Sequence, residues 1–376
     1  MKLAFIMEST YNSGGMERML AVTANEMTKY YQVTVISAFN EGRKEFFCFA
    51  ENVRRMDLGL RRSDYASFKM LKQAYREGLE EFLMKERFDV CVSLGSLEFF
   101  FLPQIQDGSK KVFWFHFALN YDLMACFASK IKIINSIVGW LRQKHRIWTA
   151  RKYDEVVVLT KADCRQWHKY LKNVTNIYNP LTVQKKRNPD YNTHCAIAVG
   201  RIERQKGFDF LVDAWKIVHA KYPDWKLDIY GTSSEGNIKV LQHQIDKNDL
   251  KDVVLMKGSS DDMAETYSRH SMMILSSRYE GLGLVLIEAA TCGLPLVSYD
   301  CQQGPSEIIE DGRNGYLVHP VGNVVGLADA ICALIADENK RRAMGEEAER
   351  MSKQFSMEHI SQDWRNMFDR LLRDRG

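Results

Sequence analysis

Long hydrophobic runs are missing from this sequence of 376 residues. No stretch reaches the roughly 18–20 consecutive apolar residues that a membrane-spanning helix needs. The apolar segment at residues 1–7 is followed at once by Glu8 and is too short for the core of a signal peptide. We therefore expect a cytoplasmic protein without a transmembrane segment.

Cysteine pairs and prolines are also scarce. The eight cysteines are scattered, and none stands in a CxxC pair or another spacing typical of a metal site. This usage favours reduced, mostly buried thiols over a disulfide framework. Two of the seven prolines fall within residues 179–193, beside three consecutive basic residues. That stretch is predicted to link two domains.

What the chain does contain is a regular alternation of short apolar runs and longer amphipathic segments. Strands are predicted at residues 3–7, 33–37, near 45–49, 88–94, 111–115 and 155–159, and again at 195–199, 226–230, 253–256, 272–275 and 295–298. Helices are predicted to begin at Gly14-Gly15 and to fill residues 65–86, 130–152, 161–171 and 358–372. This rhythm predicts an α/β protein with two Rossmann-like, doubly wound parallel sheets, over residues 1–180 and 181–356.

Charge is divided unevenly between these halves. Residues 1–180 hold 27 Lys and Arg against 19 Asp and Glu, whereas residues 181–376 hold 25 against 29. Halves of opposite sign suggest different partners, although chance would also give such a division.

Residues 278–290 carry the clearest chemical signal. An apolar strand precedes them, Gly281 and Gly283 break the pattern, and an apolar helix follows. A strand, a glycine turn and a helix N-terminus form an anion site, because unpaired N–H groups point out of the turn. Glu280 lies in the turn, and Glu288 lies within the apolar helix, where an acid is costly to bury without partners.

A second loop of this kind follows the strand at 195–199. Gly200, Arg201 and Lys206 precede a helix that begins near Phe208, so both cations are placed where a diphosphate would rest. A solvated turn would show the same residues. Pairing with residues 278–290 favours a site, since the carboxyl ends of parallel strands meet at one edge.

The two loops together resemble the retaining nucleotide-sugar glycosyltransferases of family 4. The resemblance rests on residues 200–207, on the two glutamates of residues 280–288, and on residues 299–309 and 311–318. It is thinner over the first half, where it rests on Gly14-Gly15, His116 and Asn179-Pro180. It implies the two-domain GT-B fold, with the C-terminal helix (residues 357–376) crossing back to the first domain. It points especially to members that extend bacterial surface glycans on lipid carriers.

The resemblance also implies roles for individual residues. Arg201 and Lys206 would bind the diphosphate, Glu288 the ribose, and Glu280 the donor sugar. His116 would contact that sugar as a binding group, although a core histidine fits the same position. Gly14-Gly15 would let the chain approach phosphate or acceptor, and a simple helix start fits equally. The expected donor-binding residues are Gly14, Gly15, Gly200, Arg201, Lys206, Glu280, Gly281, Gly283, Leu284 and Glu288, and His116, Glu280, Arg201 and Lys206 form the catalytic set.

No metal cofactor is expected. No Asp-x-Asp pair ends a predicted strand, and Asp261 and Asp262 are interpreted as acids at a helix N-terminus. Cations and helix dipoles would then meet the charge of the departing diphosphate. The expected donor is a UDP-sugar whose sugar the sequence does not identify.

A basic segment in the first half is the candidate acceptor or membrane surface. Between Asp122 and Asp154 there are seven Lys or Arg and no acid. Apolar residues, including Ile137, Leu141 and Trp148, share one helical stripe. Such a helix can lie on an anionic inner-membrane surface or hold a lipid diphosphate, and an ordinary packed helix with a solvated basic side is the alternative. The patch consists of Lys130, Lys132, Arg142, Lys144 and Arg146. Nucleic-acid binding is not expected, since no known module with stacking aromatics is present.

Three other functions compete with glycosyl transfer. A dinucleotide oxidoreductase would use Gly281 and Gly283 with Asp300, but the third glycine is replaced by Leu286. A nucleotide-sugar 2-epimerase would share the fold without needing an acceptor. A catalytically dead binding module would bind the donor without turnover. The set of phosphate and ribose residues favours transfer.

Overall fold

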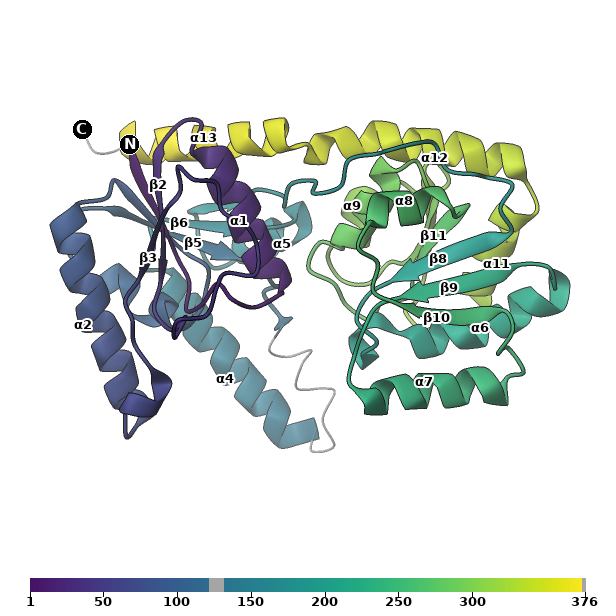
Figure 1. Cartoon of the computed structure of the whole chain (residues 1–376), viewed down its shortest axis with the longest axis horizontal. Coiled ribbons are helices and arrows are strands. Elements are labelled where there is room, and N and C mark those ends of the chain that lie inside the picture. The colour runs from purple at the N-terminus through teal and green to yellow at the C-terminus, as the bar shows by residue number, and fades with distance from the viewer. Residues whose placement is uncertain (122–131, 374–376) are drawn as a thin grey trace. The chain divides into compact units, whose positions relative to one another are not determined.

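The computed structural model describes residues 1–121 and 132–373, with the backbone alone for residues 132–136. The chain forms two compact units. The first unit comprises Met1–Pro180 and Met357–Gly376, and the second comprises Leu181–Ser356. Each unit is built on a parallel sheet flanked by helices, which confirms the predicted fold class (Figure 1).

The first sheet has seven strands in the order β3-β2-β1-β4-β5-β6-β7. All neighbours in it pair parallel. The direction of winding reverses between β1 and β4. The strands are β1 (Lys2–Ile6), β2 (Gln32–Ser37), β3 (Arg54–Asp57), β4 (Val90–Ser93), β5 (Lys110–Phe115), β6 (Glu155–Val158) and β7 (Val174–Asn176).

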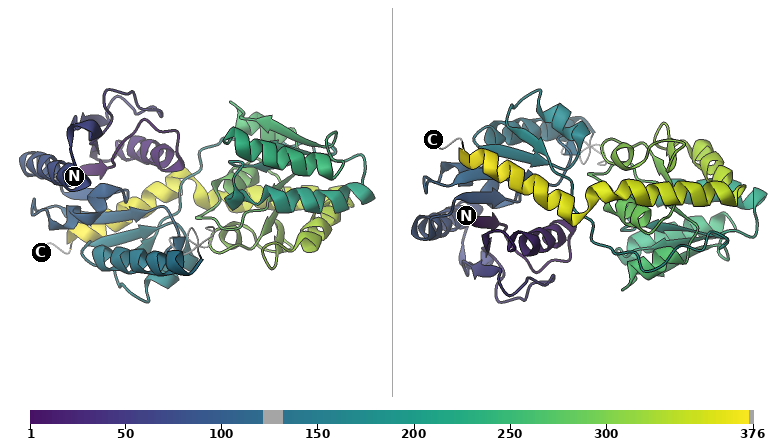
Figure 2. Two further views of the ribbon diagram at one scale, coloured as in Figure 1. Left: turned by 90° about the horizontal axis from the view of Figure 1, so that it is seen from below. Right: turned by 90° about the horizontal axis from the view of Figure 1, so that it is seen from above.

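Helices bury both faces of this sheet, which is why its central strands are apolar on both sides. They are α1 (Gly15–Met27), α2 (Phe68–Glu86), α4 (Lys132–Ala150), α5 (Lys161–Trp167) and α13 (Met357–Arg373). Figure 2 shows α13 lying across one face of the sheet. There Trp364 packs edge-on against Trp114 of β5, with ring centroids 5.0 Å apart, and against Phe5 of β1 at 6.5 Å. The C-terminal helix thus completes the core of the first unit.

The second sheet has six strands in the order β10-β9-β8-β11-β12-β13, and its winding reverses between β8 and β11. The strands are β8 (Cys195–Val199), β9 (Lys226–Tyr230), β10 (Val254–Gly258), β11 (Met272–Leu275), β12 (Leu296–Tyr299) and β13 (Gly315–Val318). The helices are α6 (Phe208–Lys221), α7 (Glu235–Lys247), α8 (Met263–Ser268), α9 (Leu284–Thr291), α10 (Pro305–Ile308), α11 (Val324–Ile335) and α12 (Glu338–Ser352). Short 3₁₀ helices are η1 (Arg62–Asp64), η2 (Leu97–Phe100), η3 (Leu102–Gln104), η4 (Arg204–Lys206) and η5 (Lys353–Phe355).

The strand predicted near residues 45–49 is wrong. Those residues form a loop, and the third strand is the polar β3 at the sheet edge. Side-chain hydrogen bonds hold this loop in place of strand pairing. The Asn25 amide of α1 donates to the Cys48 carbonyl at 3.1 Å and accepts from the Ala50 N–H at 2.7 Å. An edge strand needs few apolar residues, so hydrophobicity pointed to the wrong segment.

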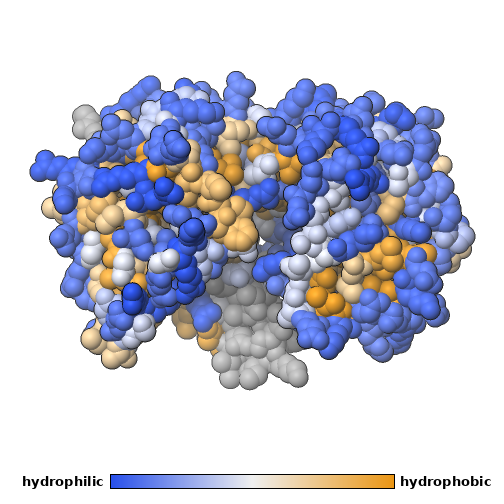
Figure 3. Space-filling model, viewed as in Figure 1, coloured by the Kyte–Doolittle hydropathy of each residue, from blue (hydrophilic) through white to orange (hydrophobic). Residues whose placement is uncertain are grey.

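The surface is mostly polar. On the face in Figure 3 hydrophilic residues predominate, and apolar residues form patches on both units, one of them over the region of α6 and α7. Among the described residues, no helix combines the length and apolar character needed to span a bilayer.

Replacing Trp364 should test whether α13 stabilises the first unit. Trp364 is 1% exposed, so Trp364→Ala should lower the free energy of unfolding by about 3–5 kcal/mol, as large-to-small core substitutions do. Urea unfolding followed by circular dichroism measures this. Trp148→Ala serves as the control, because Trp148 is 54% exposed. Equal effects of the two substitutions would contradict the role of α13.

Candidate functional site

The best candidate site lies at the carboxyl ends of β8 and β11. The winding of the second sheet reverses between these neighbouring strands. In open parallel sheets ligands bind at such a switch point, because the loops that follow the two strands diverge and leave a crevice. The two loops singled out from the sequence, residues 200–207 and 276–283, are the ones that follow β8 and β11.

The β8–α6 loop is shaped by two glycines with positive φ. The Lys206 side chain lies so close to Gly200 that a Cβ there would be 3.0 Å from Lys206 Cδ. Gly207 has φ +64° and is the N-cap of α6, and a Cβ on it would lie 2.1 Å from the carbonyl oxygen of Ser276. The two loops therefore touch backbone to backbone, and a side chain at position 207 would separate them.

Polar contacts fasten the same two loops together. The Arg278 N–H donates to the Gln205 carbonyl at 2.8 Å, and the Ser276 hydroxyl donates to the Lys206 carbonyl at 2.9 Å. The Arg278 guanidinium binds both oxygens of Asp209, at 2.8 and 2.5 Å. Sequence reasoning missed Asp209 and Ser276, since neither stands out in its own segment.

Lys206 and Glu280 are brought together at this junction. Lys206 Nζ lies 2.7 Å from Glu280 Oε1, and both side chains are largely buried. The Ser277 hydroxyl donates to the same Oε1 at 2.5 Å. Among the described residues one ammonium donor of Lys206 is therefore used, and two remain for another acceptor. The pair presents a cation and a carboxylate side by side.

Arg201 lies in the same loop but is arranged differently. Its side chain is 69% exposed and pairs with Glu203 at 3.2 Å. An exposed pair of this kind contributes little to stability, so Arg201 can leave it for a stronger anion at small cost.

The N-terminus of α9 completes this edge. Gly283 is its N-cap with φ +83°, and Leu284 is its first residue. The first N–H groups of a helix lack partners within the helix and carry the positive end of its dipole. Gly281 and Gly283 thus stand where an anion could approach the chain.

The acid inside α9 is buried and hydrogen-bonded. Glu288 is 5% exposed, and it accepts hydrogen bonds from the hydroxyls of Thr182 at 3.1 Å and Tyr267 at 3.3 Å. These donors stabilise a carboxylate in an apolar helix. Thr182 falls in the segment that the sequence marked as a linker, and no local pattern pointed to it.

Gln303 is a further polar residue that sequence reasoning missed. It is 5% exposed, has φ +62°, and neither polar atom of its side chain has a hydrogen-bond partner among the described residues. It follows β12 and precedes Gly304, where a Cβ would lie 2.8 Å from the Leu282 carbonyl. A buried, unsatisfied amide in a strained backbone beside residues 280–284 is typical of a ligand contact.

The first unit holds the remaining candidates. His116 follows β5, and its Nε2 is buried without a hydrogen-bond partner among the described residues. Burial lowers the pKa of His116 to about 3, so its imidazole is neutral at physiological pH. Gly14 is the N-cap of α1 and Gly15 its first residue, and the Glu17 carboxylate folds back against Gly14. A carboxylate of this chain thus occupies the N-terminus of α1.

Of the predicted basic patch, the structure describes the side chains of three residues. Arg142 and Lys144 are exposed on α4. Arg146 instead turns inward, with its guanidinium 4.8 Å from the centre of the Phe115 ring. Lys130 lies outside the described residues, as does the side chain of Lys132.

Asp262 is the N-cap of α8. Its side chain accepts a hydrogen bond from the Glu265 N–H at 3.1 Å, as predicted for an acid at a helix start.

A methyl group at position 207 should disrupt this junction. Because Gly207 has φ +64° and a Cβ there meets the Ser276 carbonyl, Gly207→Ala should cost about 1–3 kcal/mol of unfolding free energy. Thermal unfolding measures the loss. Gly236→Ala in α7 is the matched control, since a Cβ there meets nothing within 4 Å. If both variants unfold at the wild-type temperature, the two loops are not in the close contact described.

Comparison with known proteins agrees with this geometry. Residues 182–351 match the family model described as glycosyl transferases group 1. An uncharacterized glycosyltransferase of Haemophilus influenzae is 27% identical over 376 residues, which cover 97% of this chain and 99% of the relative. The amylovoran biosynthesis glycosyltransferase AmsD of Erwinia amylovora is 28% identical, over 98% of this chain and 99% of its own.

A solved structure extends the likeness to the whole fold. A variant of S. aureus TarM, in complex with fondaparinux, alpha-GlcNAc-glycerol and UDP, matches with a TM-score of 0.78 and 16% identity. The match covers 98% of this chain and 99% of TarM. The chain therefore has the predicted GT-B fold, and most of its second unit is similar to the glycosyl transferases group 1 model.

Proposed function

We propose that this protein transfers a hexose or N-acetylhexosamine from a UDP-sugar to a glycan acceptor, with retention of the anomeric configuration. The observation that carries the proposal is the junction of the β8–α6 and β11–α9 loops, where Lys206 and Glu280 lie 2.7 Å apart at the switch point of the sheet. The UDP in the TarM complex and the relatives in surface-glycan synthesis support the choice of donor and acceptor.

The donor diphosphate would rest between two sources of positive charge. Lys206 has free ammonium donors, and Arg201 is exposed and can turn toward the ligand. The N-termini of α6 and α9 add partial positive charge at the same edge. These groups would stabilise the charge that develops on the departing UDP, without a metal cofactor.

The remaining site residues would bind the two sugars of the donor. Glu288 would accept hydrogen bonds from the ribose hydroxyls, in place of or beside those of Thr182 and Tyr267. Glu280 would face the transferred sugar. The unsatisfied amide of Gln303 fits the same role, since a hydroxyl can both donate to it and accept from it.

The reaction would proceed on one face of the donor sugar. The bond from the anomeric carbon to the phosphate oxygen breaks, and the acceptor oxygen forms the new bond from the same side. The acceptor proton passes to the departing phosphate. His116 would contribute a neutral hydrogen-bonding group, because a histidine with a pKa of about 3 is a poor proton acceptor at neutral pH.

We further propose that α4 binds an anionic membrane surface, which would place the enzyme at the cytoplasmic face and bring it to a lipid-linked acceptor. Four apolar side chains of α4 are half exposed: Ile137, Trp140, Leu141 and Trp148, at 56%, 51%, 53% and 54%. Their spacing puts them on one stripe of the helix. Lys144 and Lys152 lie over the rings of Trp140 and Trp148, at 5.5 and 3.5 Å. Exposed aromatic and basic residues on one stripe are typical of interfacial helices.

Removing either donor-site charge should abolish most activity. Lys206→Ala should lower kcat/KM by roughly 10²–10³, the loss seen when a charge-stabilising group is removed. Glu288→Ala should lower kcat/KM by a similar factor, because the ribose hydroxyls lose their acceptor and buried polar groups are left unpaired. The assay is UDP release in the presence of a glycan acceptor. The donor is chosen beforehand by thermal stabilisation with UDP-glucose, UDP-galactose and their N-acetyl forms.

Exposed residues of the same unit provide matched controls. Lys216→Ala on α6 and Asp329→Ala on α11 remove charges of the same signs away from the loops, since Asp329 pairs with Lys221 at the C-terminal end of α6, and both variants should keep wild-type rates. Circular dichroism confirms the fold of each variant. Near-normal turnover in Lys206→Ala or Glu288→Ala would remove the site assignment.

Neutralising the α4 region should weaken membrane binding. Changing Lys130, Lys132, Arg142 and Lys144 to Gln should reduce co-sedimentation with phosphatidylglycerol liposomes by roughly tenfold or more, at about 1 kcal/mol per charge. The control neutralises Lys69, Lys72, Arg76 and Lys85 of α2, which changes the net charge equally. Sedimentation that is unchanged, or equally reduced by both sets, would refute a specific α4 surface.

A further inference from the structure

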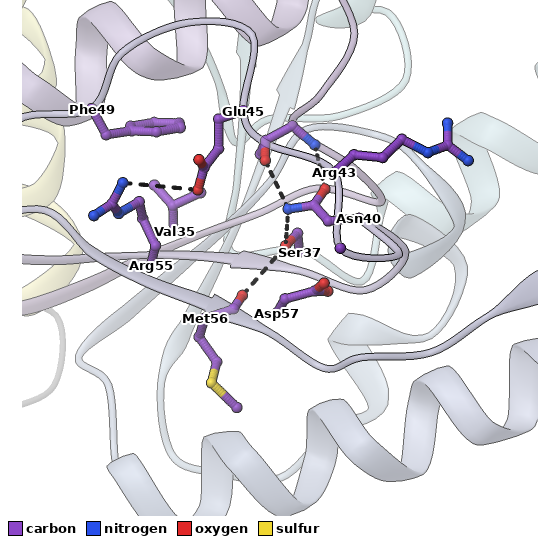
Figure 4. Close-up of a pocket in the computed structure, with 11 residues that line it drawn as sticks. Val35, Ser37, Asn40, Arg43, Glu45, Phe49, Arg55, Met56 and Asp57 are labelled. Carbon is purple, nitrogen blue, oxygen red and sulfur yellow. Dashed lines mark hydrogen bonds and ion pairs between the residues drawn. The ribbon is translucent and has the colours of Figure 1, made fainter.

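The first unit contains a cavity of its own, of about 250 Å³, at the carboxyl ends of β2 and β3 (Figure 4). Val35 and Ser37 of β2 pair with Arg55 and Asp57 of β3, so these four residues share one face of the sheet and form the floor. The loop after β2 contributes the other walls, among them Asn40, Glu45 and Phe49. No residue of the proposed donor site lines this cavity.

The walls are held in place before any ligand arrives. Asn40 is buried and makes three hydrogen bonds, accepting from the Thr10 N–H at 2.9 Å and donating to the hydroxyls of Thr10 and Ser37 at 3.0 and 2.9 Å. The Phe46 N–H donates to the Thr10 carbonyl at 3.1 Å, and Asn25 of α1 fixes the end of the loop. A preformed pocket avoids the entropy of ordering a loop on binding.

Asp57 is the residue that this framework leaves unsatisfied. Its Oδ1 is buried and has no hydrogen-bond partner among the described residues. A carboxylate oxygen removed from water without a donor is costly, so the site is suited to a ligand that supplies one.

Arg55, on the same floor as Asp57, offers hydrogen-bond donors. Arg55 Nη1 lies 4.0 Å from Glu45 Oε1, too far for a hydrogen bond, so among the described residues the guanidinium keeps its donor groups for a ligand. Arg43 does not compete, because its side chain points away, bonds Glu41 at 2.8 Å and lies 4.1 Å from the Tyr11 ring.

The charges and shape of the pocket select the class of ligand. One guanidinium faces two carboxylates, Glu45 and Asp57, so the interior disfavours a phosphate or another anion. The polar groups include both donors and acceptors, and Phe49 adds an aromatic ring. The volume is below the roughly 300–1,000 Å³ of pockets for drug-sized ligands and suits one ring-sized molecule. A sugar ring fits, because each hydroxyl donates and accepts and its C–H face packs on an aromatic ring.

We propose that this cavity binds one uncharged sugar ring, with Asp57 and Arg55 bridging adjacent hydroxyls and Phe49 packing against the ring face. Together with the proposed function, on which this step rests, the ring is a sugar of the acceptor. The acceptor would thus be recognised by a saccharide unit within the first unit and not through a lipid phosphate alone.

Direct binding tests the pocket without requiring activity. Saturation-transfer-difference NMR is recorded on the whole protein saturated with UDP, using the methyl α-glycosides of glucose, galactose and N-acetylglucosamine as probes. At least one glycoside should give a signal that Asp57→Asn and Phe49→Ala reduce at least fivefold. Asp64→Asn, an exposed acid of the same unit outside the cavity, and Glu280→Gln should leave it unchanged.

Kinetics then separates this inference from the proposed function. With a saccharide acceptor, Asp57→Asn should raise the acceptor KM roughly tenfold, while the affinity for UDP and the slow hydrolysis of the UDP-sugar without acceptor stay at wild-type levels. If the wild-type protein did not bind UDP, that result would contradict the proposed function, whereas glycoside binding seen by NMR would still support the pocket.

Two outcomes would overturn the pocket assignment. One is a glycoside signal that is equal in wild type and in Asp57→Asn. The other is that Mg²⁺ or an amine, and no glycoside, binds in an Asp57-dependent way. Glu45→Gln is a second variant of the cavity, and it should fold normally because Glu45 lies in a surface loop. Glu51→Gln in the same loop is its control.

Discussion

The close approach of two loop backbones in the second unit is the constraint on which its site depends. Gly207 leaves no room for a side chain against the Ser276 carbonyl, and the hydrogen bonds on either side of it hold the loops at that distance. Because the loops touch, Lys206 from one reaches Glu280 from the other. The parallel sheet places the two loops side by side, and Gly207 allows their backbones to come into contact. A cation and a carboxylate from segments more than seventy residues apart thus become one polar centre.

The charged groups of this centre, Lys206 and Glu280, are preorganised for ligand binding. Separating a buried pair leaves an uncompensated charge, which costs about 3–5 kcal/mol, so an anion must approach Lys206 while Glu280 keeps its contact. The free ammonium donors allow this arrangement, and Ser277 steadies the carboxylate meanwhile. Glu288 is prepared in a similar way by the two hydroxyls that bind it. Such preorganised groups need little rearrangement when a charge develops beside them.

The sequence allowed the fold and the two loops of this site to be predicted, because both follow from local patterns. Apolar runs marked the central strands, glycines marked the turns, and an acid among apolar residues marked Glu288. Features that depend on residues far apart in the sequence could not be predicted in this way. Arg54–Asp57 forms an edge strand with few apolar residues, and Thr182 and Tyr267 meet Glu288 from elsewhere in the chain. Gln303 shows its unsatisfied amide and positive φ only in three dimensions.

The two units share one architecture, but their candidate sites carry charge of opposite sign. In the second unit, a lysine and helix N-termini face the switch point, which favours a diphosphate. In the first unit, the N-terminus of α1 is occupied by Glu17, and the cavity beside β3 holds two carboxylates against one guanidinium. A diphosphate is therefore unfavourable in the first unit and favourable in the second. These electrostatics would direct the donor to the second unit and the acceptor sugar to the first. A mutation in one unit could then change the affinity for one substrate without changing the affinity for the other.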